Sequence, residues 1–569
     1  MKLKLLRVVL FVVMLSFSSV KAQITMPDYG YGSRGILCSQ KFFDMMLLQK
    51  SEIILSDVIK NFPESNATDK AALLKAKIDI ASGNYALADQ QLDNFIRTRA
   101  NSPLVPSAML MRAFMTYNWQ KFDRAEELFK IAANAAEENF KLRNDSIYLK
   151  HSSTAWFWRA ISLTQQGKYQ ESQPIFKQCF EQFPKDDFAD DALFMLGQLE
   201  ELNRRYDKAI EYYSKCVGLF PYSNVYIAAR TREVNNRLIL RESAKALVLI
   251  EKTQYILDKI MENDSVGKLY EPQSFADDAS EELHYLSGEA NNLEQRYDRA
   301  LSIFDSFLKT YYQSDFTDFV LLGAGWASLN LGENERALTY YDDIIQKNDS
   351  ESKEYSLAQL FHTVALKRMG EREQAKKELS ALAVQPTYPY LGLALLELGQ
   401  LYYENEDFEN AARTLERAER EARDAVVSIR VNILLGATYV ELRKWANAVT
   451  QYNAAEILAL KSSEIFMPNK EWYLAEARLK QGIALVKSYN NMEAIPILSE
   501  FIAENSKDPR VDEALFWQGE AYYRANMLQN AIEIYNKLLN MFPQSKRHEE
   551  TLYSLGWSHF RLKDFEKSS

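Results

Sequence analysis

The chain has 569 residues, a hydrophobic content of 47% and a formal net charge of −10 at pH 7. This length exceeds that of one ordinary globular core, so the chain forms either several domains or an array of repeats. The acidic balance disfavours nucleic-acid backbones and anionic lipid as partners. We therefore expect protein partners and no nucleic acid.

The N-terminus has the pattern of a secretory signal peptide over residues 1–22. Three basic residues precede an apolar run over 8–15, and Val20-Lys21-Ala22 satisfies the small-residue rule for cleavage before Gln23. The apolar run is shorter than the ~20 residues that span a bilayer. We predict an exported protein whose mature chain is not inserted in a membrane, in the periplasm or at the periplasmic face of the outer membrane.

A unit of about 34 to 38 residues recurs along most of the chain. Each copy has Gly or Ala in a first helix, a small residue twelve positions later, and an aromatic residue or Leu four positions after that. The small residues predict places where two antiparallel helices approach closely, with the large residue filling the space beside them. The clear copies have their first small residue at Ala160, Gly197, Gly288, Gly325, Gly399, Gly436, Gly482 and Gly519, and weaker copies at Ala76, Ala113 and Thr363.

The spacing of these copies predicts the domain organisation. We expect an N-terminal tail and capping helix over 23–68, a first repeat array over 69–224, an irregular helical joint over 225–280 and a second array over 281–569. The joint lacks the Gly or Ala of the first helix but keeps helical apolar spacing. The last copy stops at the position of its second small residue, which predicts a chain truncated within that repeat.

This pattern resembles the tetratricopeptide repeat. The Phe-Pro endings of several second helices and the run YDKAIEYY over 206–213 are similar to those of exported bacterial, Bacteroidetes-like members. Periplasmic examples are the cell-division coordinator that binds TolA and the repeat lipoprotein of the outer-membrane Bam complex. The resemblance implies an all-α fold, a right-handed α-solenoid of about 11 to 12 stacked helical hairpins.

Solenoids of this kind bind partners on a concave face lined by their first helices. Positions three before, one after and four after the first small residue are expected to face inward. Aromatic residues recur at these positions, although aromatic side chains at helical spacing also fill cores. The predicted partner-binding residues are Phe194, Gln198, Tyr285, Trp326, Tyr403, Phe516, Glu520, Tyr523, Tyr553 and Trp557.

The sequence carries no motif for catalysis or for a cofactor. Its five His residues form no pair at metal-ligand spacing, and Walker A, G-x-S-x-G and H-E-x-x-H motifs are lacking. We predict no enzyme, no cofactor and no metal. Ser146 and Ser265, each between an Asp and an apolar residue, resemble the acceptor for O-glycosylation in Bacteroidetes, and ordinary turn sequence explains them equally well.

The predicted function is a non-enzymatic protein–protein interaction scaffold of the bacterial cell envelope. Its partners would be other envelope proteins or peptides, including those of a peripherally bound outer-membrane complex. One alternative is a SusD-like glycan- or ligand-binding envelope protein, but such chains combine a few repeats with a large irregular domain. A second alternative is the repeat part of a longer protein with a further C-terminal domain.

Overall fold

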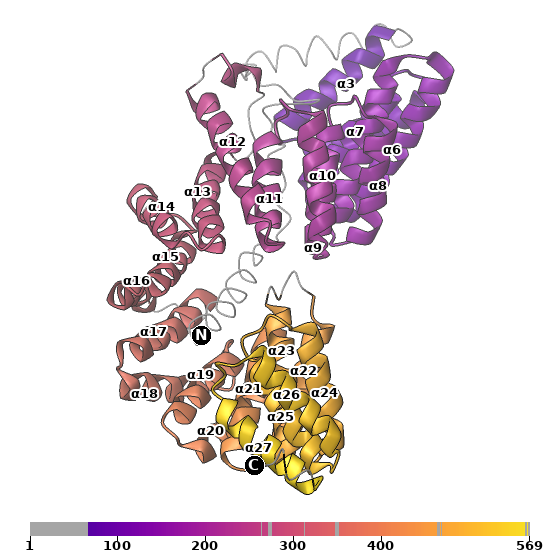
Figure 1. The fold of residues 1–569 in the computed structure, drawn as a ribbon. Helices are drawn as coiled ribbons and strands as arrows, with labels where there is room; N and C mark the ends of the chain where they lie inside the picture. The colour runs from indigo at the N-terminus through magenta and orange to yellow at the C-terminus, as the bar shows by residue number, and fades with distance from the viewer. Residues whose placement is uncertain are drawn as a thin grey trace. The chain divides into compact units, whose positions relative to one another are not determined.

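A computed structural model describes residues 66–569 apart from 263–264, 271–275, 312, 348–351, 464–466, 468, 564–565 and 567–569. The predicted signal peptide and all but the end of the predicted tail lie outside the described residues. Within the described residues the structure has 25 α-helices, a single 3-10 helix and no strand (Figure 1). The predicted all-α fold class is confirmed.

The chain divides into two compact units, between Ala290 and Asn291 within α13. The predicted joint at 225–280 therefore lies inside the first unit, where it contains a further helical hairpin. The helices of the first unit are α3 (Asn66–Ala81), α4 (Tyr85–Thr98), α5 (Val105–Asn118), α6 (Phe122–Arg143), α7 (Ser146–Gln165), α8 (Tyr169–Gln182), α9 (Ala189–Leu202), α10 (Tyr206–Leu219), α11 (Tyr226–Ile239), α12 (Ser243–Met261), η1 (Gly267–Leu269) and most of α13 (Ala276–Leu293).

The second unit continues the same alternation of helices. Its helices are α14 (Tyr297–Thr310), α15 (Thr317–Leu331), α16 (Asn334–Gln346), α17 (Lys353–Met369), α18 (Arg372–Ala383), α19 (Leu391–Glu404), α20 (Phe408–Glu421), α21 (Ala425–Glu441), α22 (Trp445–Lys461), α23 (Lys470–Lys487), α24 (Asn491–Glu504), α25 (Val511–Arg524), α26 (Leu528–Met541) and α27 (His548–Arg561). Odd-numbered helices are the first helices of the hairpins, and successive first helices such as α19 and α21 or α23 and α25 contact each other.

The small residue of each first helix, called the anchor below, is covered by the large residue sixteen positions later. A Cβ atom added to Gly436 would lie 2.8 Å from Cε1 of Tyr452, and one added to Gly482 would lie 2.6 Å from Cδ2 of Leu498. The space beside each anchor glycine is therefore filled by a side chain of the second helix. The sequence pattern predicts instead that the backbones of the two helices approach each other there. The predicted register of the repeats is confirmed at these glycines.

The second small residue of each repeat is fully buried where the two helices of a hairpin meet. Ala209, Ala300, Ala411 and Ala531 all have no exposed surface, because here the second helix presses against the first. A larger side chain at such a position has no space to occupy. The burial explains why this alanine is the least variable feature of the repeat along the chain.

One repeat was hidden in the predicted joint. Val234 of α11 holds the anchor position, Ala246 of α12 follows twelve residues later and Ile250 four after that, all buried. Val replaces Gly, and a branched aliphatic side chain replaces the aromatic ring. The two changes compensate in volume, so the hairpin forms without the glycine on which the sequence pattern relied.

The turn between the two helices of a repeat is also invariant along the described chain. The residue seven positions after the anchor has a positive φ, as at Gly167 and Gly332, where Gly has no Cβ to strain. The same conformation is held by non-glycine residues at Gln120, Arg204, Arg241, Gln295, Glu406, Arg443, Tyr489, Asn526 and Lys563. The turn within each hairpin thus has a backbone conformation that most of these side chains disfavour.

Candidate protein-binding face

Half of the predicted binding residues are core residues. Phe194, Gln198, Tyr285, Trp326 and Phe516 are all buried. A side chain buried to this extent has no surface to offer a partner. We therefore correct the prediction for these five and keep it for the other five.

The buried aromatic rings contact other repeat residues. Phe194 lies against the anchor-covering Tyr213, with ring centroids 5.7 Å apart. Trp326 lies against Phe361 of the next first helix, at 6.1 Å. In these repeats, positions three before and one after the anchor therefore face the second helix and the next repeat, and their aromatic residues stabilise the stack. On α27, the last described first helix, the same positions are held by Tyr553 and Trp557 and are exposed.

The remaining predicted residues keep accessible surface. Tyr403, Glu520 and Tyr523 are partly exposed, whereas Tyr553 and Trp557 on α27 are 69% and 44% exposed. Glu520 is already engaged, because its Oε1 accepts hydrogen bonds from Tyr535 (2.9 Å) and Ser554 (2.8 Å). The accessible part of the prediction thus lies on α19, α25 and α27.

A buried carboxylate links successive first helices of the first unit. Glu201 of α9 accepts a hydrogen bond from the Asn236 amide of α11, and Arg232 Nη1 lies 3.9 Å from Glu201 Oε2. Burial raises the pKa of Glu201, and the distant guanidinium only partly opposes this effect. A second carboxylate, Glu282 of α13, acts on the same arginine.

The second unit has the opposite arrangement, with two cations on one carboxylate. Glu397 of α19 has no exposed surface; it pairs with Lys367 of α17, and Arg430 Nη2 of α21 lies 3.4 Å from its Oε1. Burial alone would raise the pKa of Glu397, but the two cations lower it below its ordinary value. The sequence signal was a charged residue inside the apolar run of α19, which the sequence analysis did not use.

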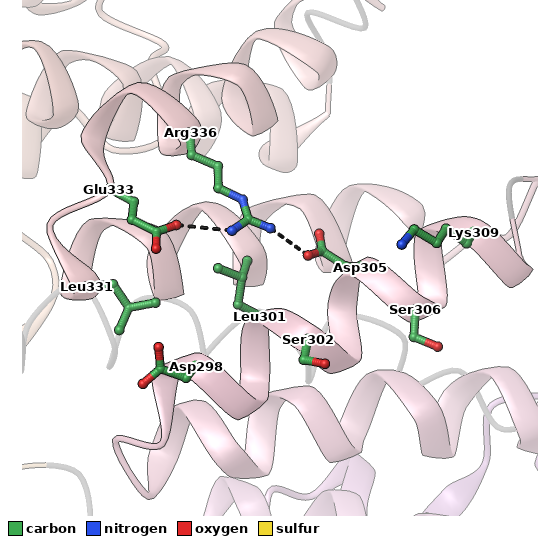
Figure 2. Close-up of a pocket in the computed structure, with 9 residues that line it drawn as sticks. All are labelled: Asp298, Leu301, Ser302, Asp305, Ser306, Lys309, Leu331, Glu333 and Arg336. Carbon is green, nitrogen blue, oxygen red and sulfur yellow. Dashed lines mark hydrogen bonds and ion pairs between the residues drawn. The ribbon is translucent and has the colours of Figure 1, made fainter.

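A hollow of the second unit is lined mainly by polar and charged side chains. It has a volume of about 430 Å³ and lies between α14 and α16 (Figure 2). Arg336 points across it and pairs with Asp305 (2.6 Å) and Glu333 (3.1 Å). Its lining also includes Ser302, Ser306 and Lys309.

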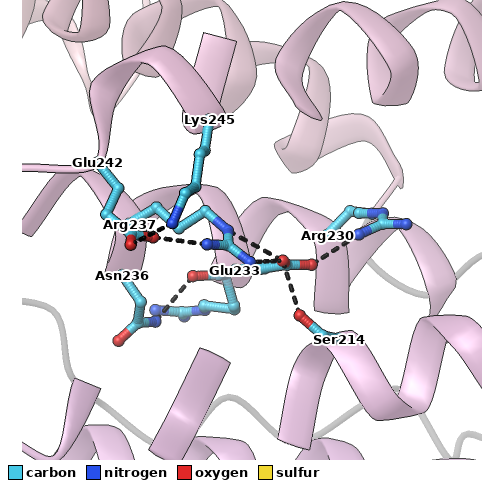
Figure 3. Close-up of polar contacts among 8 residues, drawn as sticks. Ser214, Arg230, Glu233, Asn236, Arg237, Glu242 and Lys245 are labelled. Carbon is cyan, nitrogen blue, oxygen red and sulfur yellow. Dashed lines mark hydrogen bonds and ion pairs between the residues drawn. The ribbon is translucent and has the colours of Figure 1, made fainter. Parts of the chain in front are cut away.

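A second polar cluster holds the hairpin of the hidden repeat together. Buried Glu233 of α11 accepts hydrogen bonds from Ser214 of α10 and from Arg230 and Arg237, each at 2.7 Å (Figure 3). Arg237 in turn pairs with Glu242 at 2.6 Å, at the start of α12. The network ties α10, α11 and α12 together, so we assign it a structural role.

The two predicted glycosylation sites are accessible. Ser146 is the exposed first residue of α7, where the Asp145 side chain accepts a hydrogen bond from the Ile147 amide at 3.0 Å. Ser265 is exposed in the turn before η1. Modification at both residues stays a prediction.

Within the described residues, no helix has both the length and the apolar character needed to cross a bilayer. The same part of the chain contains no group of three or more His, Cys, Asp or Glu side chains placed to hold a metal ion.

Comparison with known families identifies the repeats. Tetratricopeptide repeat families match residues 159–224 and 479–546, and also 319–350 and 393–424. These segments coincide with hairpins of both units. The chain therefore contains tetratricopeptide repeats. A search of curated proteins finds no match.

Solved structures with similarity to this chain include the APC/C hetero-tetramer Cut9-Hcn1, which is 15% identical over 90% of this chain and 94% of that one, with a TM-score of 0.34. A tetratricopeptide repeat protein from Parabacteroides merdae ATCC 43184 is 15% identical over 50% of this chain and 98% of its own, with a TM-score of 0.38. The C-terminal part of a repeat-containing protein from Cytophaga hutchinsonii is 16% identical over 47% and 99%, with a TM-score of 0.35.

Proposed function

We propose that this protein is a non-enzymatic scaffold that binds other proteins of the bacterial cell envelope along its first helices. The observation that carries the proposal is that the register of the repeats recurs throughout the described residues of both units. Equivalent positions recur on successive first helices in each unit, and such surfaces suit extended or helical protein segments. The repeats extend through the described residues, which favours a scaffold over a SusD-like glycan-binding protein.

The envelope location rests on the signal-peptide pattern of residues 1–22. Export would place the protein in the periplasm or at the periplasmic face of the outer membrane, where it would meet envelope proteins or an outer-membrane complex. Fractionation of cells that express the full-length gene tests this proposal. Recovery in the cytoplasmic fraction would contradict it.

Affinity capture from envelope extract tests the binding role. Changing Tyr523 and Tyr553 to Ser should remove captured partners without lowering the melting temperature, since exposed rings contribute more to binding than to folding. The matched control is Phe516→Ser, which removes a buried ring and should cost ~3 to 5 kcal/mol of stability. A stable double variant that still captures every partner would refute binding at this part of the face.

A further inference from the structure

The last three first helices of the second unit carry a row of basic side chains in one register. Lys487, Arg524 and Arg561 each lie five positions after an anchor glycine, on α23, α25 and α27. These helices contact each other in sequence. The three cations therefore recur once per repeat along one edge of the helix layer.

Aromatic rings hold each of these cations in place. The Nζ of Lys487 lies 5.1 Å from the ring of Trp445 and 5.6 Å from that of Trp517. The guanidinium of Arg524 lies 5.9 Å from the ring of Tyr489, and that of Arg561 lies 4.9 Å from the ring of Tyr523. Such stacking fixes the positions of long side chains in advance and lowers the entropic cost of binding.

Carboxylates lie near two of the three cations, because Glu441 and Glu513 act on Lys487 and Glu520 acts on Arg524. Arg524 approaches Glu520 at 3.4 Å, a carboxylate that already accepts two other hydrogen bonds. Arg561 donates to the Asn526 side-chain oxygen at 2.7 Å. Within the described part of the chain, neither Lys487 nor Arg561 forms a salt bridge.

A structural role accounts for part of this register. Arg524 donates to the Val486 carbonyl oxygen (3.3 Å) at the end of the preceding first helix, and Arg368 donates to the Leu329 carbonyl in the same way. These contacts cap the helix C-terminus. Lys487 and Arg561 also lie in the last turns of α23 and α27, where a cation interacts favourably with the helix dipole. Arg368 supplies a control in the same register on α17, outside the row.

We propose that the row of Lys487, Arg524 and Arg561 binds an extended, acidic segment of a partner protein, with carboxylates about three residues apart. The inference rests on the scaffold function proposed above. Neighbouring helices lie ~8 to 10 Å apart. A chain in the extended polyproline II conformation rises ~3.1 Å per residue with three residues per turn, so every third side chain lies on the same face and meets the next cation. Glu404 and Glu441 occupy the same register in the two preceding repeats and end the site by repulsion.

Fluorescence anisotropy with synthetic peptides and the full-length protein tests the proposal. The first probe is a twelve-residue peptide with Glu at every third position and Ser or Ala elsewhere. The second has the same composition with its four glutamates adjacent, and the third has Lys in place of Glu. The spaced acidic peptide should bind about tenfold more tightly than either of the others, which corresponds to ~1.4 kcal/mol.

Variants assign the binding to the row. A triple variant should bind the spaced peptide about tenfold or more weakly than wild type and with a smaller salt dependence. It combines Lys487→Gln, Arg524→Gln and Arg561→Gln. Arg368→Gln should leave the binding unchanged. Equal binding of the spaced and clustered peptides, or equal binding by wild type and the triple variant, would overturn the proposal.

A gain of affinity gives an independent test. Glu441→Lys extends the row by one repeat, so a peptide with one more spaced glutamate should bind more tightly to this variant than to wild type. Equal affinity of this variant and of wild type for the longer peptide would contradict the proposal that residue 441 continues the row. Equal binding of single-stranded DNA would show unspecific attraction of anions and would also overturn the proposal. If envelope partners are captured but no acidic peptide binds, the scaffold function stands and this inference fails.

Discussion

The two units bury a carboxylate on their first helices in opposite ionic settings. In the first unit Glu201 meets an amide and one guanidinium at 3.9 Å, with a second carboxylate nearby, and its pKa is raised. In the second unit Glu397 lies between Lys367 and Arg430, and its pKa is lowered. The difference shows that burial alone does not set the charge state of such a group; the number of close cations does.

The largest expected effect comes from neutralising Glu397, and the same change at Glu201 should have a much smaller one. Glu397→Gln leaves two buried cations without their shared counter-ion and should cost ~3 to 5 kcal/mol. Glu201→Gln relieves the burial of a charge and should change stability by less than about 1 kcal/mol. Hydrogen exchange of peptides from α19 and α9 measures both changes. Equal losses at the two sites would break the comparison.

A second contrast concerns the covered anchors of the two units. Gly197→Ala places a Cβ 2.7 Å from Cδ1 of the rigid Tyr213 ring, and overpacking of this kind costs ~1 to 3 kcal/mol. Gly399→Ala meets Leu415, whose side chain can change rotamer, and Ala favours the helix by ~1 kcal/mol. We expect a net loss at Gly197 and little change at Gly399 in urea unfolding. A larger loss at Gly399 would contradict the assigned packing.

The same carboxylates predict opposite responses to pH. The raised pKa of Glu201 means that the folded state binds its proton more readily, so its contribution to stability falls as pH rises from about 4.3 through the folded pKa. The lowered pKa of Glu397 gives stability that is present above about 4.3 and is lost as pH falls through the folded pKa.

Stability curves of wild type against each Gln variant isolate these contributions. The free energy of unfolding of wild type, relative to that of Glu201→Gln, should rise on acidification towards pH ~4. The free energy of unfolding of wild type should exceed that of Glu397→Gln, and this excess should shrink only below about pH 4. Curves that run parallel across this range would show that neither carboxylate shifts on folding.

The smallest expected effects come from the turn with positive φ. Gly167→Ala in the first unit meets no atom within 4 Å, so its cost of ~1 kcal/mol is that of the backbone conformation alone. Glu406→Gly in the second unit should gain up to about 1 kcal/mol by removing the same strain. Thermal unfolding of both variants measures the pair. A stabilising Gly167→Ala would show that the turn differs from the one described.

The repeat could be recognised in the sequence because its packing follows local steric rules. A small anchor and a large residue sixteen positions later must fit together within one hairpin, so each copy records the packing of its own helices. A larger residue at the anchor can nevertheless be offset by a smaller one sixteen positions later. For that reason the sequence pattern did not reveal the hairpin of Val234 and Ile250. The helical class and the register were therefore predictable, whereas this repeat was recognised only from its burial.

The binding face was predicted with less success because core and surface use the same side chains. Phe194, Trp326 and Phe516 occupy inward registers, yet neighbouring helices cover them. Of the predicted residues, Tyr403, Glu520, Tyr523 and those of α27 keep accessible surface. By itself the sequence determined which residues share a hairpin, since that packing is local. The pairing of Glu397 with Lys367 and Arg430 was decided by the stacking of repeats, because these contacts join residues 30 and 33 positions apart, on different hairpins.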